Sequence, residues 1–130
     1  MSGITPEYMH AELTKSIIGA SIEVHRALGP GLLESVYEEC LCHELSLRGH
    51  PFRRQVAVPL VYKDVRLASE LVIDVLVAET VVVELKSVTN VLPVHQAQLL
   101  TYMKLAGVKV GLLINFNVPS LRDGITRRVL

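Results

Sequence analysis

Apolar residues recur at helical spacing over two stretches in the first part of the chain. In residues 7–28 and again in residues 32–47 they fall three or four positions apart, which places them on one face of a helix. The sequence Gly-Pro-Gly at 29–31 interrupts the pattern between the two stretches. The pattern therefore predicts two helices joined by a short turn and packed as an antiparallel pair.

The period of the pattern changes after residue 50. Residues 56–62 alternate apolar and other side chains, as a strand with one buried face does, and Pro59 favours a place at the edge of a sheet. Residues 67–77 and 81–87 are rich in β-branched side chains and are separated by three residues. Together they predict a β-hairpin.

A third helix is predicted over residues 94–106, which follow a proline and precede a glycine. Residues 109–115 are apolar without interruption in their middle, which predicts a strand buried inside a sheet, and residues 125–130 favour a last strand. The order is ααβββαβ with a further β at the end. It predicts a mixed α/β fold, a mixed sheet of four or five strands flanked by helices, in a single domain over residues 1–130.

Composition narrows the classes of function. The chain has 130 residues, half of them hydrophobic, and 13 basic residues balance 13 acidic ones, which argues against a disordered chain and against a protein that coats nucleic acid by charge alone. No apolar run approaches the ~20 residues of a membrane span. Residues 1–13 lack the cationic start and apolar stretch of a signal peptide, so we expect a cytoplasmic protein with no membrane partner. Residues 104–130 carry five Lys and Arg against Asp123 alone, so this end is expected to face an anionic partner.

The two cysteines, Cys40 and Cys42, lie two positions apart on a predicted helix. Side chains at that spacing point to different faces, so they are poorly placed to bridge each other or to share a metal. We expect two free, small, buried or half-buried side chains.

The residues best suited to chemistry lie on the predicted hairpin. Glu84 and Lys86 are two apart on one strand and so project to the same face. If residues 78–80 form the loop, Asp74 lies directly opposite Glu84, with the two Cβ atoms ~5 Å apart. Two carboxylates and an ammonium would then meet on an otherwise apolar sheet, where oxygen ligands suit Mg²⁺ or Mn²⁺. The alternative is an exposed cluster of ordinary cross-strand ion pairs.

Polar residues on the third predicted helix could add to this site. His95, Gln98 and Tyr102 share one face, and because Leu99 and Ala106 lie beside them, we expect that face to pack inward over the hairpin. Buried groups of this kind need hydrogen-bond partners, which a metal site or a bound phosphodiester would supply. A buried polar network without catalysis is the alternative.

Two further candidates lie on the first two helices. His25 falls within the apolar arc of its helix and is either a metal ligand or a core histidine with its hydrogen bonds satisfied. Glu34 lies in the first turn of the second helix, where the helix dipole favours a carboxylate even without a function. Its position favours it over Glu38 and Glu39 as a third acid of the site.

These residues together resemble the GxxExxY proteins, small bacterial and archaeal proteins assigned to the PD-(D/E)XK nuclease-like superfamily. The motif stands here as residues 31–37, GLLESVY, and the resemblance extends over residues 17–127 to Asp74, to VVVELKSV and to LINF with Gly124. Gln98 and Tyr102, four apart after the E-x-K stretch, are similar to a motif of RecB-like nucleases. Ile73 stands where the superfamily often has proline.

The resemblance implies a restriction-endonuclease-like core. It also implies that Asp74 and Glu84 bind the metal and that Lys86 is the catalytic lysine. Glu34 would be the acid on the helix and His25 a further metal contact, and Gln98 and Tyr102 would orient the site or touch the nucleic acid backbone. The expected activity is a Mg²⁺- or Mn²⁺-dependent nuclease acting on DNA or RNA.

Two other functions stay open from the sequence. One is a non-catalytic module that keeps the fold and binds nucleic acid or a protein. The other is a small-molecule metal enzyme that uses the same residues. A chain this small is also expected to form a homodimer or to join a larger complex.

Overall fold

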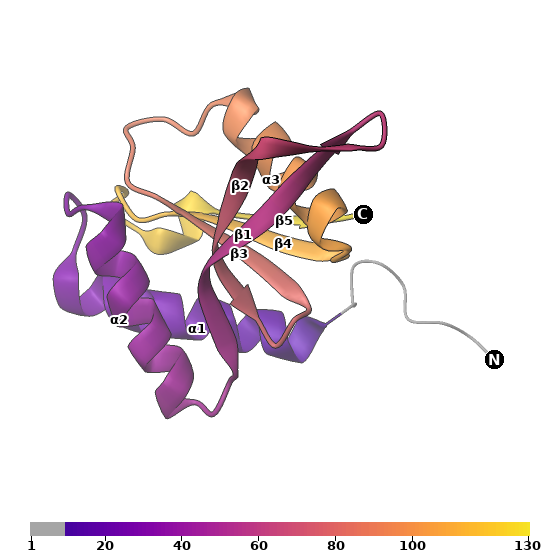
Figure 1. The fold of residues 1–130 in the computed structure, drawn as a ribbon. Coiled ribbons are helices and arrows are strands. Elements are labelled where there is room, and N and C mark those ends of the chain that lie inside the picture. The colour runs from indigo at the N-terminus through magenta and orange to yellow at the C-terminus, as the bar shows by residue number, and fades with distance from the viewer. Residues whose placement is uncertain (1–9) are drawn as a thin grey trace.

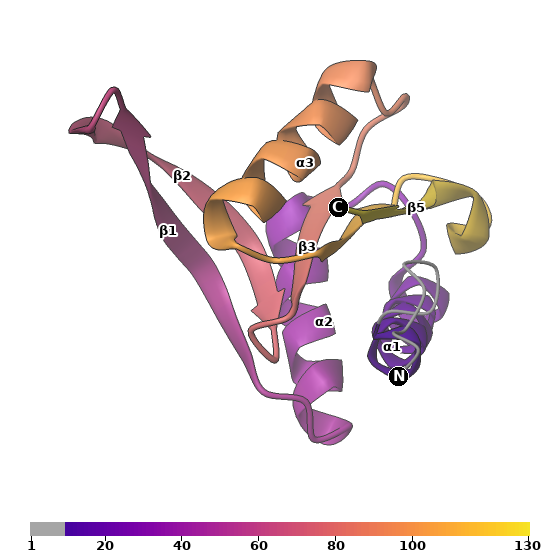
Figure 2. The same cartoon turned by 90° about the vertical axis from the view of Figure 1, so that its right-hand side faces the viewer.

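The computed structural model describes residues 10–130. Helix α1 (Ala11–Leu28) and helix α2 (Glu34–Leu47) are joined by a turn in which Gly29 and Gly31 take positive φ angles, as the glycines predicted. The predicted start of the first helix at residue 7 lies outside the described residues. The two helices contact each other but cross steeply (Figures 1 and 2), so the prediction of an antiparallel pair is wrong.

Five strands form one mixed sheet in the order β1-β2-β3-β4-β5. They are β1 (Phe52–Tyr62), β2 (Val65–Val77), β3 (Val81–Lys86), β4 (Val110–Asn115) and β5 (Ile125–Val129). Strands β3 and β4 run parallel and the other neighbours antiparallel. The predicted order of elements is confirmed, as are the edge position of the strand that contains Pro59 and the interior position of β4.

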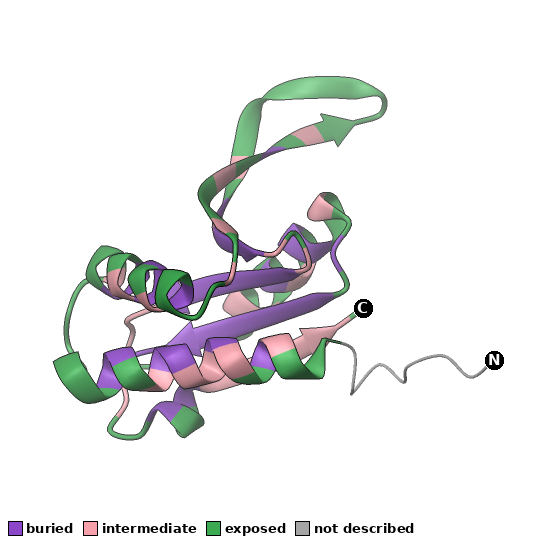
Figure 3. Ribbon diagram, turned by 90° about the horizontal axis from the view of Figure 1, so that it is seen from below, coloured by how far each residue is buried: buried purple, intermediate pink, exposed green. Residues whose placement is uncertain are grey.

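Helices cover both faces of the sheet, and each face has its own core (Figure 2). Helices α1 and α2 pack with Phe116 on one face, and helix α3 (Pro93–Ala106) packs through Leu99 and Met103 on the other. Strands β3 and β4 lie between the two layers and are buried almost throughout (Figure 3). Among residues 10–130 no helix is long and apolar enough to cross a membrane.

The hairpin of β1 and β2 extends well beyond the three strands beside it. Strand β2 pairs with β3 only over Val75–Val77, whereas its pairing with β1 continues out to Val65. The outer part, residues 59–72, projects from the body as a two-stranded ribbon whose residues are mostly exposed (Figures 1 and 3). We call residues 59–72 the arm.

Candidate functional site

Asp74 and Glu84 lie together where β2 and β3 diverge. Regular pairing of these strands ends at Val75 opposite Val83, in the register that the three-residue loop predicted. At the next level the side chains replace the ladder. The backbone N–H of Asp74 donates to Glu84 Oε1 at 3.0 Å, and the backbone N–H of Leu85 donates to Asp74 Oδ2 at 2.8 Å. The two carboxylates therefore hold the strands at the point where they separate.

The pair lies on the face of the sheet that α3 covers. Glu84 alternates with Val82, which packs under α3, and Lys86 follows on the same face. Glu84 is only 6 % exposed. Burial and the charge of the Asp74 carboxylate raise the pKa of Glu84 to about 9, although Lys86 partly opposes the shift. The pair thus has more negative charge than its surroundings neutralise.

A change of face in both strands places Asp74 there. Val75 and Val77 of β2 pack beneath α1 and α2, whereas Ile73 packs under α3, which strict alternation would not allow. Strand β1 changes face at the same level, at Gln55, which lies opposite Asp74 and has a φ of 50°. Such a φ is uncommon for any residue but glycine and marks an irregular strand.

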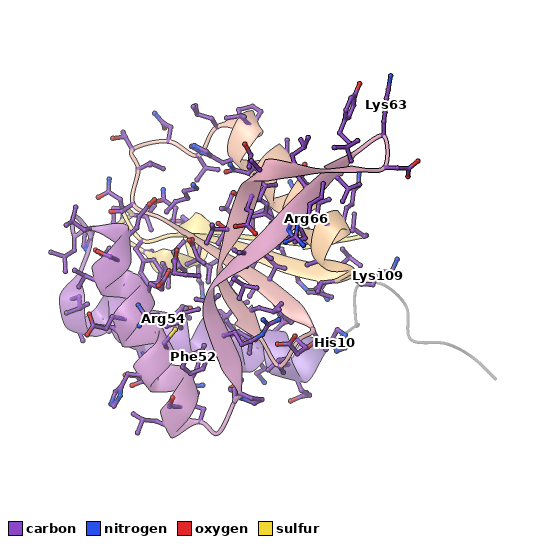
Figure 4. All side chains as sticks on the ribbon, in the orientation of Figure 1. His10, Phe52, Arg54, Lys63, Arg66 and Lys109 are labelled. Carbon is purple, nitrogen blue, oxygen red and sulfur yellow. The ribbon has the colours of Figure 1, made fainter. Side chains whose placement is uncertain are left out.

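Buried Glu38 of α2 fixes this irregularity. Its Oε1 accepts a hydrogen bond from Gln55 Nε2 at 2.6 Å, and its Oε2 accepts two from the Arg54 guanidinium at 2.9 and 3.1 Å (Figure 4 labels Arg54 beside α2). Glu38 is 6 % exposed, so these bonds satisfy a charge that would otherwise be costly to bury. The sequence favoured Glu34 over Glu38 and missed this positioning role, because nothing in a helical pattern shows which strand a carboxylate will meet.

Tyr102 is the residue of α3 that the structure places at the acid pair. It is 7 % exposed, and burial followed by the negative charges of Glu84 and Asp74 raises its pKa. The inward face of α3 is formed by Leu99, Tyr102 and Met103. Gln98 lies outside that stripe and is exposed, so the prediction that it faces inward is wrong.

His95 is half-buried at the start of α3. Its Nδ1 accepts a hydrogen bond from the backbone N–H of Leu92 at 3.0 Å, which caps the first turn of the helix. This nitrogen is therefore already used, and the Nε2 atom is the one left for a contact with a substrate.

Glu34 and His25 do not form a ligand group with the pair. Glu34 is half-buried and lines a shallow cleft with Ser87, the residue after Lys86, so it lies near the same end of β3. His25 is buried, and its Nε2 donates to the carbonyl oxygen of Val118 at 2.8 Å, as a satisfied core histidine does. Within residues 10–130, no three His, Cys, Asp or Glu side chains are arranged to hold a metal ion.

The motif at residues 31–37 has a structural role here. The Tyr37 hydroxyl donates to the carbonyl oxygen of Gly29 at 2.6 Å and accepts from the backbone N–H of Leu32 at 3.1 Å, while its ring stacks on Phe116 at 4.4 Å. These contacts fix the turn that precedes Glu34.

Replacing Tyr37 with phenylalanine should lower the free energy of unfolding by about 1–2 kcal/mol, because two hydrogen bonds are lost while the ring stack is kept. Thermal unfolding would measure the change. The exposed Tyr62, replaced in the same way, is the matched control and should leave the melting temperature unchanged. A Tyr37→Phe protein as stable as wild type would contradict the role assigned to the hydroxyl.

Asn115 is a second residue that the sequence did not single out. It lies opposite Lys86 in β4 and is 3 % exposed. Its Oδ1 accepts from the backbone N–H of Val88 at 3.1 Å, and its Nδ2 donates to the Val88 carbonyl oxygen at 2.9 Å. The chain is therefore held just after it leaves the site. The only signal in the sequence was a polar residue closing an apolar strand.

An open groove of about 850 Å³ lies between α1 and α2, and its lining includes none of the acid pair or Lys86. It contains Cys42, whose pKa burial raises to about 11, so its thiol stays protonated and is a poor nucleophile. Both cysteines are free, as predicted. The groove offers a space without the chemistry that the acid pair has.

The donor set of the acid pair fits a hard divalent cation. Mg²⁺ is usually held by one or two carboxylates and keeps several waters, so Asp74 and Glu84 suffice without a third acid. The raised pKa of Glu84 points to the same conclusion, because it reflects negative charge that a cation would neutralise.

Comparison with known proteins gives one match. A family model described as the PD-(D/E)XK nuclease superfamily matches residues 11–128, nearly the whole chain. No curated protein and no solved structure gives a significant match. The match includes both residues of the acid pair and their surroundings.

Proposed function

The chain belongs to the PD-(D/E)XK nuclease superfamily, and on this basis we propose that it hydrolyses phosphodiester bonds of DNA or RNA with Mg²⁺ or Mn²⁺. The observation that carries the proposal is the buried contact of Asp74 with Glu84 beside Lys86, in which the pKa of Glu84 is raised to about 9. Folding alone gains little from two adjacent carboxylates, since burying like charges is costly.

The side chains would divide the work. Asp74 and Glu84 would hold the cation, which when bound lowers the pKa of a water and neutralises charge on a phosphate. Lys86 would donate hydrogen bonds to the water and to the phosphate oxygens, where negative charge develops. Tyr102 keeps its proton because its pKa is raised, so its hydroxyl can donate to the same oxygens.

Residues at the rim would contact the rest of the nucleic acid. Gln98 is exposed on the helix that carries Tyr102, and His95 lies one turn earlier, where its Nε2 can reach a substrate. Glu34, in the cleft beside Ser87, would contact waters outside the acid pair. Within the superfamily we assign the chain to the GxxExxY group, supported by the way Tyr37 fixes the turn before Glu34.

A second function, a non-catalytic module, has one observation in its favour. Both carboxylates already accept backbone hydrogen bonds, and this role of closing a diverging strand pair needs no metal. The two functions differ in whether Lys86 matters, because these backbone hydrogen bonds form without it.

Purified protein with Mg²⁺ or Mn²⁺ should cleave DNA or RNA, single or double stranded, and a chelator should stop the cleavage. Lys86→Ala should lower the rate about 10²-fold or more, since the group that stabilises developing charge is lost. Its affinity for Mn²⁺, measured by calorimetry, should change little because the lysine is not a ligand.

The exposed Lys63, replaced by alanine, is the matched control and should cleave at the wild-type rate. Equal rates in Lys86→Ala and wild type would reject the role of the lysine. The absence of both cleavage and metal binding would favour the non-catalytic module.

A further inference from the structure

The arm carries an apolar face that nothing in the described part of its own chain covers. Val58 and Leu71 pair at its base and pack into the core under α3, and Tyr62 pairs with Val65 at its tip. The register shifts by two residues between Pro59 and Val61, an even number that keeps alternate side chains on the same faces. The core face of the sheet therefore continues along the arm to its tip.

Exposure rises along this face. Val58 is 7 % exposed, Leu67 41 %, and Tyr62 and Val65 about 60 %. The core of α3 thus ends as an open apolar stripe on a ribbon of only two strands (Figure 3). An isolated two-stranded hairpin is at best marginally stable in water, and an apolar stripe of this kind marks an interaction site.

Charge indicates what covers the stripe. The arm has two basic residues, Lys63 and Arg66, and two acidic ones, Asp64 and Glu70. Figure 4 shows Lys63 at the tip, directed away from the body, and Arg66 Nη2 lies 3.9 Å from Glu70 Oε2 on the opposite face of the ribbon. A balanced surface gives no net attraction for a polyanion, but it is complementary to itself across a two-fold axis.

The free edge of the arm makes addition of a further strand difficult. Pro59 lacks a backbone N–H, and the shift of register beside it breaks the regular line of donors and acceptors. A partner therefore meets the apolar face rather than the edge.

We propose that the arm is a homodimer interface, in which the apolar face of residues 60–71 packs against the same face of a second copy. Stable dimers bury about 800 Å² and about 20–30 residues on each side. The arm alone is smaller than this, so the interface extends onto the neighbouring end of α3, where Leu105 is 40 % exposed. The inference is independent of the proposed nuclease activity.

Light scattering or sedimentation of the full chain should give twice the monomer mass at micromolar concentration. Val65→Asp should weaken the dimer by about 30-fold or more, as the loss of a central interface side chain does. Leu47→Asp is the matched control, because Leu47 is 67 % exposed on α2, far from the arm in the chain, and should leave the mass unchanged. Circular dichroism would show that both variants are folded.

Hydrogen exchange on the unaltered protein provides a second test. Amides of residues 59–72 should become more protected as the protein concentration rises, while those of α1 and α2 should not change. A monomer at all concentrations overturns the proposal, as does a dimer that Val65→Asp leaves intact or arm amides whose exchange is independent of concentration.

Discussion

Replacing Asp74 with asparagine should abolish metal-dependent cleavage, with a loss of about 10³-fold or more. Asparagine keeps the oxygen that accepts from the Leu85 N–H, so the strands should stay closed at this point. What disappears is the negative charge that a divalent cation needs from its ligands. Calorimetry with Mn²⁺ should therefore show loss of binding together with loss of activity, in contrast to Lys86→Ala.

The control is Asp64→Asn, which removes an equal charge from the turn at the tip of the arm. It should leave both cleavage and Mn²⁺ affinity at their wild-type values. A non-catalytic module would respond differently, because it would tolerate Asp74→Asn or bind a polyanion more tightly once a negative charge is gone. Cleavage that persists unchanged in Asp74→Asn would exclude this site as its source.

Local pattern predicted the elements and the central part of the site. The hairpin register followed from alternation and a three-residue loop, and these two features alone were enough to place Asp74 opposite Glu84. The interior position of β4 followed from an unbroken apolar run. These features depend on side chains near in sequence, whose periodicity directly reflects which face is buried.

Features that depend on packing between distant elements were not predictable. The steep crossing of α1 and α2 follows from how each helix fits the twisted sheet rather than from the short turn between them. Gln98 was expected to face inward because it lies next to Leu99 in the sequence, yet the buried stripe of α3 passes it by one position. The contact of Glu38 with Gln55 joins residues 17 apart, through a positive φ that no alternation rule anticipates.

Glu84→Gln should make the metal-free protein more stable while removing metal binding. In the folded protein the pKa of Glu84 is raised from 4.5 to about 9, so at pH 7 folding must bind a proton that the unfolded chain releases. Each pKa unit corresponds to about 1.4 kcal/mol, and pH 7 lies well above the ordinary value, so the cost at pH 7 is about 3 kcal/mol. Glutamine carries no such cost. Its oxygen can still accept from the Asp74 N–H, and its amide can donate to the Asp74 carboxylate.

The pH dependence separates this cause from a simple change in packing. Between about pH 4.5 and 9 the folded protein binds more protons at Glu84 than the unfolded chain, so the Glu84 contribution to stability falls as pH rises and levels off above the folded pKa. Chemical denaturation without metal should show the gain of Glu84→Gln growing from a small value at pH 5 to its largest value near pH 9. The exposed Glu39, changed to glutamine, should stay within about 0.5 kcal/mol of wild type throughout. A gain that is constant with pH would mean that Glu84 is not held at the expense of stability, and the case for a cation at the acid pair would lose its main physical support.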